Sequence, residues 1–366
     1  MEITSTAAEP EHPPAGLARK QEAMRCTQRA ATLITVAIAA LGLAATTAAS
    51  AASAPAARIK VTATIAVGPQ PFGVAADPRT NTIYVANTRN NTVSVISGRT
   101  NTVITTIPVG RFPSGVAINP RSGTIYVTNE HSGTVSVISR RTNTVVATIQ
   151  VGEGPEGVAV DPRTGTIYVT NVFSGTVSVI NGQTNTVATT IRVGRLPVGV
   201  GVNPHTGAVY VARAPNLVSV ISVRTNTVVA TIRVGRAPFA VAADPQANTI
   251  YVTNASSKTV SVISGRTNTV VATTRVGYPA AFGVAADPQA NTIYVANGDD
   301  QTVAISGRTN TVVARVRVGP CALGAATNPR TDTIYVTNAC GNTVSVLVSC
   351  RGRAAAPEPE ARCRKE

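Results

Sequence analysis

Three carboxylates and one imidazole lie close together in the sequence, at Glu130, His131, Glu153 and Glu156. Such groups together can hold a divalent cation or transfer protons during catalysis. Acidic residues in short loops can equally serve only to keep those loops hydrated. The sequence has no serine–histidine–acid arrangement, no metal-binding cysteine spacing and no phosphate-binding loop. The four residues are therefore candidates for acid–base catalysis, and the sequence predicts no cofactor and no definite metal site.

Apolar residues form a second group with a possible binding role. Four of them share one position of a sequence repeat and a tyrosine lies beside them: Phe72, Phe239, Phe282, Leu323 and Tyr278. An apolar surface at the mouth of a channel can serve as a ligand platform. The alternative interpretation is that these side chains plug the channel and pack against neighbouring loops.

Four arginines are predicted on the same face of the molecule as these aromatic residues: Arg111, Arg195, Arg213 and Arg236. Arginine interleaved with aromatic rings is a common way to hold single-stranded nucleic acid, and stacking is worth about 1–3 kcal/mol per base. The same mixture suits an acidic glycan. The whole chain has 32 Lys and Arg against 17 Asp and Glu, a net charge of +15. This charge attracts anionic partners but does not choose among nucleic acid, anionic glycans and acidic cell envelopes.

A further arginine series recurs at turn positions. We interpret its members mainly as solvated turn residues, which could also help the protein adhere to anionic wall polymers in a salt-dependent way. They are Arg79, Arg99, Arg121, Arg141, Arg163, Arg224, Arg266, Arg308 and Arg330.

Seven tyrosines set the framework that must position all these residues. They recur at intervals of 42, 42, 42, 41, 43 and 41 residues: Tyr84, Tyr126, Tyr168, Tyr210, Tyr251, Tyr294 and Tyr335. A period of about 40–45 residues with four short strand patterns per unit is typical of a propeller blade. The sequence therefore predicts an all-β, seven-bladed β-propeller with four antiparallel strands in each blade.

Four strand-like runs separated by turn residues make up each unit. In the third unit they span residues 157–161, 166–170, 176–180 and 186–193. The first run is rich in Gly, Val and Ala, which suits crowding around a central axis. The fourth carries charge or proline in its several copies, as at Arg192 and Pro108, which is typical of a protected edge. The strands should thus follow the chain from the inside of each blade to the outside.

Closure of the ring is predicted from the two ends of the repeat region, residues 59–349. The last unit ends after its third strand, residues 343–347, and residues 61–67 resemble the fourth strand at 228–234. The N-terminal strand should therefore complete the seventh blade, a three-plus-one closure. Loops between second and third strands share one face with the connections between blades, called the top here. The other turns lie on the bottom.

The tyrosine phrases resemble those of the YVTN-repeat propellers. Four copies read Tyr-Val-Thr-Asn, at residues 126–129, 168–171, 251–254 and 335–338. Two have Ala for Thr, at 84–87 and 294–297, and one ends in arginine, at 210–213. The resemblance implies a surface-layer or exported protein of this fold. Propeller lactonases and an antibiotic-opening lyase share the architecture more distantly, and no catalytic residue carries over from the motif.

The N-terminal 51 residues read as a secretory signal with an unusual leader, and translation starting at Met24 is an alternative. Residues 52–58 read as a linker and 350–366 as a tail. No second apolar run of spanning length follows the signal. We therefore expect a secreted or cell-surface protein without a transmembrane segment in its mature form.

Four cysteines follow the signal segment: Cys321, Cys340, Cys350 and Cys363. An even number of cysteines in an exported chain suits disulfides, and three pairings are possible. The repeat geometry favours Cys321 with Cys340 and Cys350 with Cys363. Four free thiols are the alternative.

The leading functional interpretation is a non-enzymatic binding or scaffold module. It would be a monomer that holds an extracellular or envelope protein or glycan through its top face, with an anionic polymer as a further partner. A lactonase- or lyase-like enzyme at the acidic cluster is the alternative from another class. Single-stranded nucleic-acid binding is the third.

Overall fold

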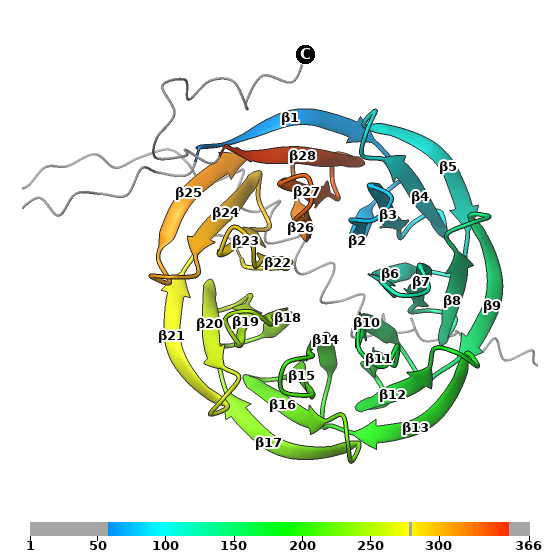
Figure 1. Cartoon of the computed structure of the whole chain (residues 1–366), viewed down its shortest axis with the longest axis vertical. Helices are drawn as coiled ribbons and strands as arrows, with labels where there is room; N and C mark the ends of the chain where they lie inside the picture. Colours follow the sequence, from blue (N-terminus) through cyan, green and yellow to red (C-terminus); the bar gives the residue numbers. More distant parts are fainter. Residues whose placement is uncertain (1–57, 278–279, 351–366) are drawn as a thin grey trace, which may run out of the picture.

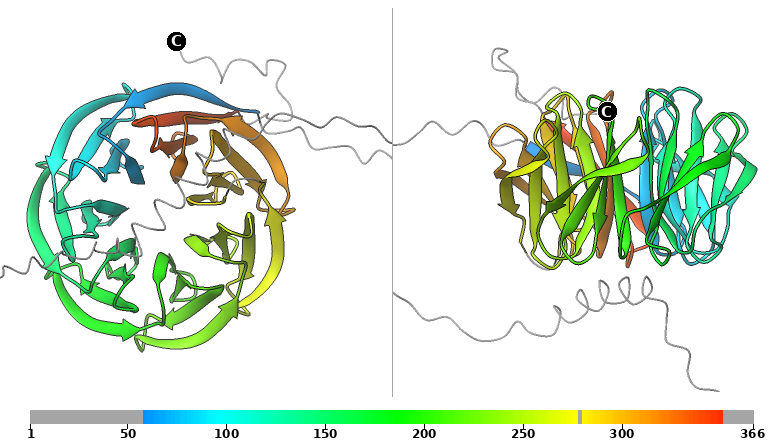
Figure 2. Two further views of the ribbon diagram at one scale, coloured as in Figure 1. Left: turned by 180° about the vertical axis from the view of Figure 1, so that it is seen from behind. Right: turned by 90° about the horizontal axis from the view of Figure 1, so that it is seen from below.

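The computed structural model describes residues 58–277 and 280–350. The regular secondary structure of these residues is all β-strand, and turns and loops join the strands. Seven four-stranded antiparallel sheets surround a central axis (Figure 1). Seen side-on, the sheets stand around the axis as a short cylinder with turns at both ends (Figure 2). The predicted seven-bladed propeller is confirmed.

The first four blades each run from the inner to the outer strand along the chain. Blade 1 comprises β2 (Pro71–Asp77), β3 (Thr82–Asn87), β4 (Thr92–Ser97) and β5 (Thr102–Pro108). Blade 2 comprises β6 (Pro113–Ile118), β7 (Thr124–Asn129), β8 (Thr134–Ser139) and β9 (Thr144–Gln150). Blade 3 comprises β10 (Pro155–Val160), β11 (Ile167–Asn171), β12 (Thr176–Asn181) and β13 (Thr186–Arg192). Blade 4 comprises β14 (Pro197–Asn203), β15 (Ala208–Arg213), β16 (Leu217–Ser222) and β17 (Thr227–Arg233).

The last three blades follow the same order except at the seam. Blade 5 comprises β18 (Pro238–Asp244), β19 (Thr249–Asn254), β20 (Thr259–Ser264) and β21 (Thr269–Arg275). Blade 6 comprises β22 (Val284–Asp287), β23 (Thr292–Ala296), β24 (Gln301–Ser306) and β25 (Val312–Arg317). Blade 7 comprises β26 (Ala322–Asn328), β27 (Thr333–Asn338), β28 (Thr343–Cys350) and β1 (Arg58–Ala66).

The N-terminal strand closes the ring as the sequence predicts. β1 pairs with β28 in antiparallel register, with Val61 opposite Leu347 and Ile65 opposite Val344. In Figure 1 the blue β1 lies along the red β28, at the outer edge of blade 7. Opposite ends of the repeat region are thus joined in one sheet, so neither end blade is left with a missing strand.

The repeat tyrosines fill the space between neighbouring blades. All seven are at most 1 % exposed. Tyr84 of blade 1 packs with Ile125 and Val127 of blade 2. At the seam, Tyr335 of blade 7 packs in the same way with Ile83 of blade 1. The core is therefore a series of apolar clusters, one at each blade interface, and not a single central core.

A β-bulge shifts the start of the inner strands relative to the sequence prediction. That prediction places the start in blade 3 at Gly157, whereas β10 begins at Pro155. The pairing with β11 changes register between Pro155 and Val158, so one extra residue lies on the inner strand. Gly157 lies in this bulge, and a Cβ there would overlap the Val198 carbonyl oxygen of blade 4. Glycine is required because the inner strands approach so closely.

The outer strands expose their arginine-bearing ends. Arg192, Arg233 and Arg275 are exposed at the ends of β13, β17 and β21, and the exposed Pro108 ends β5. This pattern agrees with the predicted protected edges. In residues 58–277 and 280–350 the structure has no helix long and apolar enough to cross a bilayer. The expected signal, linker and tail fall almost wholly outside the described residues.

Candidate functional site

The threonine of the Tyr-Val-Thr-Asn phrase links two blades, which gives the motif a structural role. The Thr170 hydroxyl donates to the Val198 carbonyl oxygen of blade 4 at 2.6 Å. It also accepts from the Gly157 backbone N–H of its own inner strand at 2.8 Å. Thr128, Thr253 and Thr337 bond to the next blade in the same way. The bulged inner strand and the neighbouring blade are therefore held by one hydroxyl.

The asparagine of the phrase holds the top loop that follows it. Asn171 Nδ2 donates to the hydroxyls of Thr176 and Ser178 at 3.0 and 2.9 Å. In blade 4, where arginine replaces asparagine, Arg213 Nε donates to the Ser219 hydroxyl at 2.8 Å. Arg213, a candidate ligand-binding residue, is thus half-buried and takes over a structural bond.

The acidic candidates lie on the top face around blades 2 and 3, but in different environments. Glu130 and Glu156 are buried, at 3 and 7 % exposure, whereas His131 and Glu153 are exposed. The Ser114 hydroxyl donates to Glu130 Oε2 at 3.4 Å. In the described part of the chain, no three His, Cys, Asp or Glu residues come together as a group that could hold a metal ion.

His131 stacks on an aromatic ring. Its imidazole and the Phe112 ring lie 4.3 Å apart between centroids and 12° from parallel. The preceding backbone is fixed by a hydrogen bond from the Glu130 N–H to the Phe112 carbonyl oxygen at 3.0 Å. The stacked ring and its exposed position suit a surface role better than a pair with the buried carboxylates.

The apolar candidates pack on one another at the channel mouth. Phe239 lies edge-on to both Phe282 and Phe72, with ring centroids 5.2 and 6.2 Å away. Phe282 and Leu323 are buried, at 4 and 6 % exposure. Because blades 1 and 5 are not neighbours, the contact between Phe72 and Phe239 spans part of the mouth. These are the contacts expected of a plug. Tyr278 lies outside the described residues.

The bulge also changes the positions of these residues relative to the inner strands. The sequence places them just before those strands. In the structure, Phe72, Phe239 and Leu323 are instead the second residues of β2, β18 and β26. Only Phe282 precedes its strand, β22, which starts at Val284.

Three of the four candidate top arginines are exposed: Arg111, Arg195 and Arg236. The backbone N–H groups of Arg111 and Arg236 donate to serine hydroxyls in the adjacent loops at 2.8 and 2.7 Å, which fixes the loops that carry them. The top also carries exposed carboxylates at Glu153 and Asp299. The top face is therefore of mixed charge.

One of the two favoured disulfides is present. Cys321, which precedes β26, is bonded to Cys340 in the loop between β27 and β28, and their Cα atoms are 5.3 Å apart. Cys321 belongs to the same buried cluster as Phe282 and Leu323. The disulfide thus ties the blade that closes the ring to the packed channel mouth. The second pairing involves Cys363, outside the described residues.

In the bottom turns that the structure describes, the exposed charged side chains are all positive. All nine turn arginines of the series named above are exposed. The carboxylates that end the inner strands on this face, Asp77, Asp161, Asp244 and Asp287, are at most 3 % exposed. Among the described residues, the bottom turns carry no exposed carboxylate, and Asp332 is half-buried. The positive surface charge is therefore not offset locally.

Turn geometry explains why the carboxylates are withdrawn. Asp161 Oδ1 accepts the backbone N–H of Arg163 at 2.8 Å, and Asp244 Oδ1 accepts that of Gln246 at 2.9 Å. An aspartate that begins a turn folds its carboxylate back onto the backbone. In the turn at Asp161, Arg163 is exposed, so that tetrapeptide buries the negative group and presents a positive one, whereas the turn at Asp244 presents the neutral Gln246.

One bottom carboxylate is also paired across a blade interface. Arg140 of blade 2 donates to Asp77 Oδ2 of blade 1 at 2.8 Å. Burial alone would raise the pKa of Asp77. The hydrogen bonds from Arg140 and the Arg79 backbone, with the charge of Arg140, outweigh it and hold this pKa below its ordinary value. Asp77 therefore stays ionised and neutralises Arg140, a cation outside the exposed series.

The sequence predicts the bottom arginines as turn residues, and its main predicted binding surface is the top face. The recurrence of arginine at fixed turn positions was visible in the sequence. What the sequence does not show directly is that the aspartates at the ends of the inner strands are buried, which leaves the arginine charges without exposed carboxylates beside them. Aspartate before proline, as at Asp161-Pro162, was the available signal, because it predicts a turn in which the carboxylate accepts a backbone hydrogen bond.

Comparison with known proteins supports the fold and nothing finer. No family model matches the chain, and no curated protein matches it in sequence. A solved structure of hydrazine synthase from Kuenenia stuttgartiensis superposes with a TM-score of 0.70 at 20% sequence identity. The match covers 76% of this chain and 95% of that one. At this identity it is a likeness of fold, and the tie to the YVTN-repeat propellers remains a resemblance of motif.

Proposed function

We propose that this protein is an exported, non-enzymatic binding propeller whose bottom face adheres to an anionic glycan polymer of a cell envelope. The observation that carries the proposal is the ring of nine exposed arginines without an exposed carboxylate among the described bottom turns. Like charges spread over one face create a potential that attracts a polyanion along its length. The disulfide between Cys321 and Cys340 supports export, because disulfides persist in oxidising compartments.

The composition of the bottom face favours a glycan over single-stranded nucleic acid. Bases are held by stacking on exposed aromatic rings. The phenylalanines lie in top segments and the seven repeat tyrosines are buried between blades. A bottom-bound polymer therefore meets guanidinium groups and neutral polar side chains but no aromatic platform among the described residues.

Two variants with equal net charge test the proposal. Arg89 is a further exposed top residue, in the loop between β3 and β4. The bottom variant R99Q/R141Q/R266Q/R308Q and the top variant R89Q/R111Q/R195Q/R236Q each remove four exposed cations. Binding to polygalacturonate is measured by titration over a range of salt concentrations, with neutral dextran as the control polymer. We expect the bottom variant to bind about tenfold or more weakly, the top variant to stay within about threefold of the parent, and binding to weaken as salt rises.

Equal losses in both variants would show that only net charge matters and would overturn the assignment to the bottom face. A larger loss in the top variant would return the site to the top. Tighter binding to a single-stranded oligonucleotide than to polygalacturonate would overturn the glycan assignment.

A further inference from the structure

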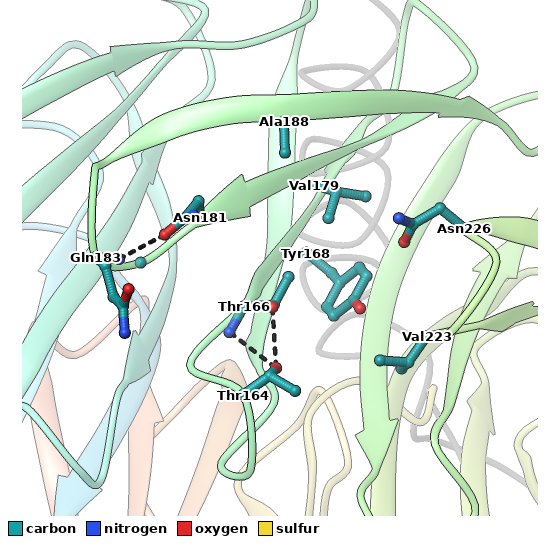
Figure 3. A pocket seen from close by; sticks show the side chains of 10 residues that line it. Thr164, Thr166, Tyr168, Val179, Asn181, Gln183, Ala188, Val223 and Asn226 are labelled. Atoms are coloured by element: carbon teal, nitrogen blue, oxygen red, sulfur yellow. Dashed lines mark hydrogen bonds between the residues drawn. The ribbon is translucent and has the colours of Figure 1, made fainter.

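A cavity of about 260 Å³ opens on the bottom between blades 3 and 4 (Figure 3). Turns of both blades and the hydroxyl end of an interface tyrosine line it. Its side chains are Thr164, Thr166, Tyr168, Val179, Asn181, Gln183, Ala188, Val223 and Asn226. Threonine, asparagine and glutamine side chains mix with small apolar ones, and none of these residues is charged.

Two residues of blade 4, one of which lines the cavity, differ from their counterparts in blades 1, 5 and 6. In blades 1, 5 and 6, an asparagine in the first-to-second turn packs against a glycine in the third-to-fourth turn: Asn81 with Gly98, Asn248 with Gly265, and Asn291 with Gly307. Blade 4 has Gly207 and Val223 at these positions, still joined by the Val223 N–H to Gly207 carbonyl bond at 3.0 Å. A Cβ added to Gly207 would meet nothing within 4 Å. Space that an asparagine fills elsewhere is open here.

The valine occupies the place where blades 1 and 3 have a glycine close to the tyrosine hydroxyl of the preceding blade. At the seam, a Cβ on Gly98 would lie 2.8 Å from the Tyr335 hydroxyl, so a larger residue cannot follow the same path. Val223 is in the equivalent place in blade 4, and it lines the cavity together with Tyr168. At the next interface, the Tyr210 hydroxyl donates to Asn268 Oδ1 at 2.8 Å.

The corresponding pair at the cavity does not form this bond. Asn226 Oδ1 is buried without a hydrogen-bond partner, as are the equivalent atoms of Asn143, Asn185 and Asn310, and Asn226 lines the cavity together with Tyr168. Figure 3 shows Tyr168 and Asn226 on facing sides of the opening. Tyr168 and Asn226 thus line the space without a bond to each other, and a ligand hydroxyl that reached Asn226 Oδ1 would supply the hydrogen bond that this atom lacks.

Cations border this neutral cavity. Arg163 and Arg224 adjoin Thr164 and Val223 in sequence, and both are exposed. Arg163 Nη1 donates to the Pro204 carbonyl oxygen at 2.7 Å, which holds the guanidinium across the interface between blades 3 and 4. A ligand in the cavity would therefore have its uncharged part among threonine and asparagine groups and its anionic part beside arginine.

We infer that the cavity binds one pyranose unit of an anionic polysaccharide, with ring hydroxyls facing Tyr168 and Asn226. This inference rests on the proposed function of the bottom face. Pockets for drug-sized ligands measure roughly 300–1,000 Å³, so this smaller space suits a single sugar ring. Sugar hydroxyls both donate and accept, as these two side chains require, and the C–H groups of the ring can contact Val179 and Val223.

The test compares two carboxylate polymers, of which only one has sugar rings. Polygalacturonate and poly-L-glutamate are titrated against the full chain at the same salt concentration. The cavity predicts a preference of about tenfold for polygalacturonate, since correctly placed hydrogen bonds are worth about that much. The variant G207N/V223G restores the residue pair that blades 1, 5 and 6 use and should abolish the preference.

A second variant protects the test against a folding artefact. Y168F removes the cavity hydroxyl and should reduce the preference, whereas Y126F removes a hydroxyl that faces the Gly182 carbonyl oxygen at 3.5 Å and should leave it unchanged. Thermal melts confirm that each variant is folded. An unchanged preference in both G207N/V223G and Y168F, or no preference in the parent, would overturn the cavity assignment. Retained salt-dependent binding of both polymers would then leave the proposed function standing, whereas absence of binding to either polymer would remove both.

Discussion

At the scale of single residues, the Thr170 hydroxyl joins two blades through the Val198 carbonyl oxygen. We expect T170V to lower the free energy of unfolding by about 1–3 kcal/mol, because valine has a similar shape and leaves a buried acceptor unsatisfied. T142V is the matched control, since the Thr142 hydroxyl bonds only to Thr144 in an exposed turn and should change stability by less than about 0.5 kcal/mol. Urea denaturation measures both. Equal effects would contradict the linking role.

The disulfide gives a second prediction at this scale. Cys321 and Cys340 are separated by 19 residues, and a loop of this length is stabilised by about 3 kcal/mol when cross-linked. C321A/C340A should therefore unfold at a lower urea concentration than the oxidised parent, and the parent in reductant should behave like the variant. Identical midpoints with and without reductant would show that the bond has no stabilising role.

At the scale of elements, the interface tyrosines make the propeller sensitive to alkali. Burial raises the pKa of Tyr84, Tyr168, Tyr251 and Tyr335 to about 12, with a nearby carboxylate adding to the effect for the first three. Between about pH 10 and 12 the unfolded chain loses these protons while the folded one keeps them. Stability should be complete below pH 10 and fall by about 1.4 kcal/mol per pH unit for each such group above it.

Denaturation midpoints at pH 9 and pH 11, read alongside tyrosinate absorbance, check this prediction. Tyrosinate should form together with unfolding. Ionisation of these tyrosines near pH 10 in a chain that remains folded would contradict their burial at the interfaces.

The elements also show what could be predicted from sequence. Blade number follows from the tyrosine period, and strand order follows from the small residues of the inner strands and the charged ends of the outer strands. These features can be predicted because each is a pattern within a single repeat. The bulge at Gly157 was not predictable from pattern, since it depends on the approach of the next blade. For the same reason, sequence located Phe72 and Phe239 on the top but not their contact across the mouth. The cavity at Val223 depends on residues from two blades, and no single repeat reveals it.

At the scale of the whole molecule, closure joins residues that are far apart in sequence. Ile65 in β1 is 5 % exposed and packs with Tyr335, Ile83 and Val344 at the seam. I65A should lower the free energy of unfolding by about 2–5 kcal/mol because it leaves a hole in this cluster. Ile104 of β5 is 56 % exposed, and I104A should cost less than about 0.5 kcal/mol. Similar costs for the two variants would indicate that the seam is not packed as described.

The distribution of charge is likewise a property of the whole ring. Four of the first-to-second turns bury a carboxylate and nine bottom turns each expose an arginine, so repetition around the ring gives a face whose exposed charges are positive. The top, where the non-repeated residues lie, carries both signs and a packed apolar mouth. Polymer binding on the bottom therefore follows from repetition more than from any single residue.

Hydrogen–deuterium exchange with and without polygalacturonate tests the central claim most directly, because it reports which face the polymer covers. We predict slower exchange in the bottom turns that carry Arg79, Arg163 and Arg308, strongest around Thr164 and Val223, and unchanged exchange in the top loops at Phe112 and Arg236. Protection confined to the top loops, or no protection of the bottom turns at saturating polymer, would contradict the account.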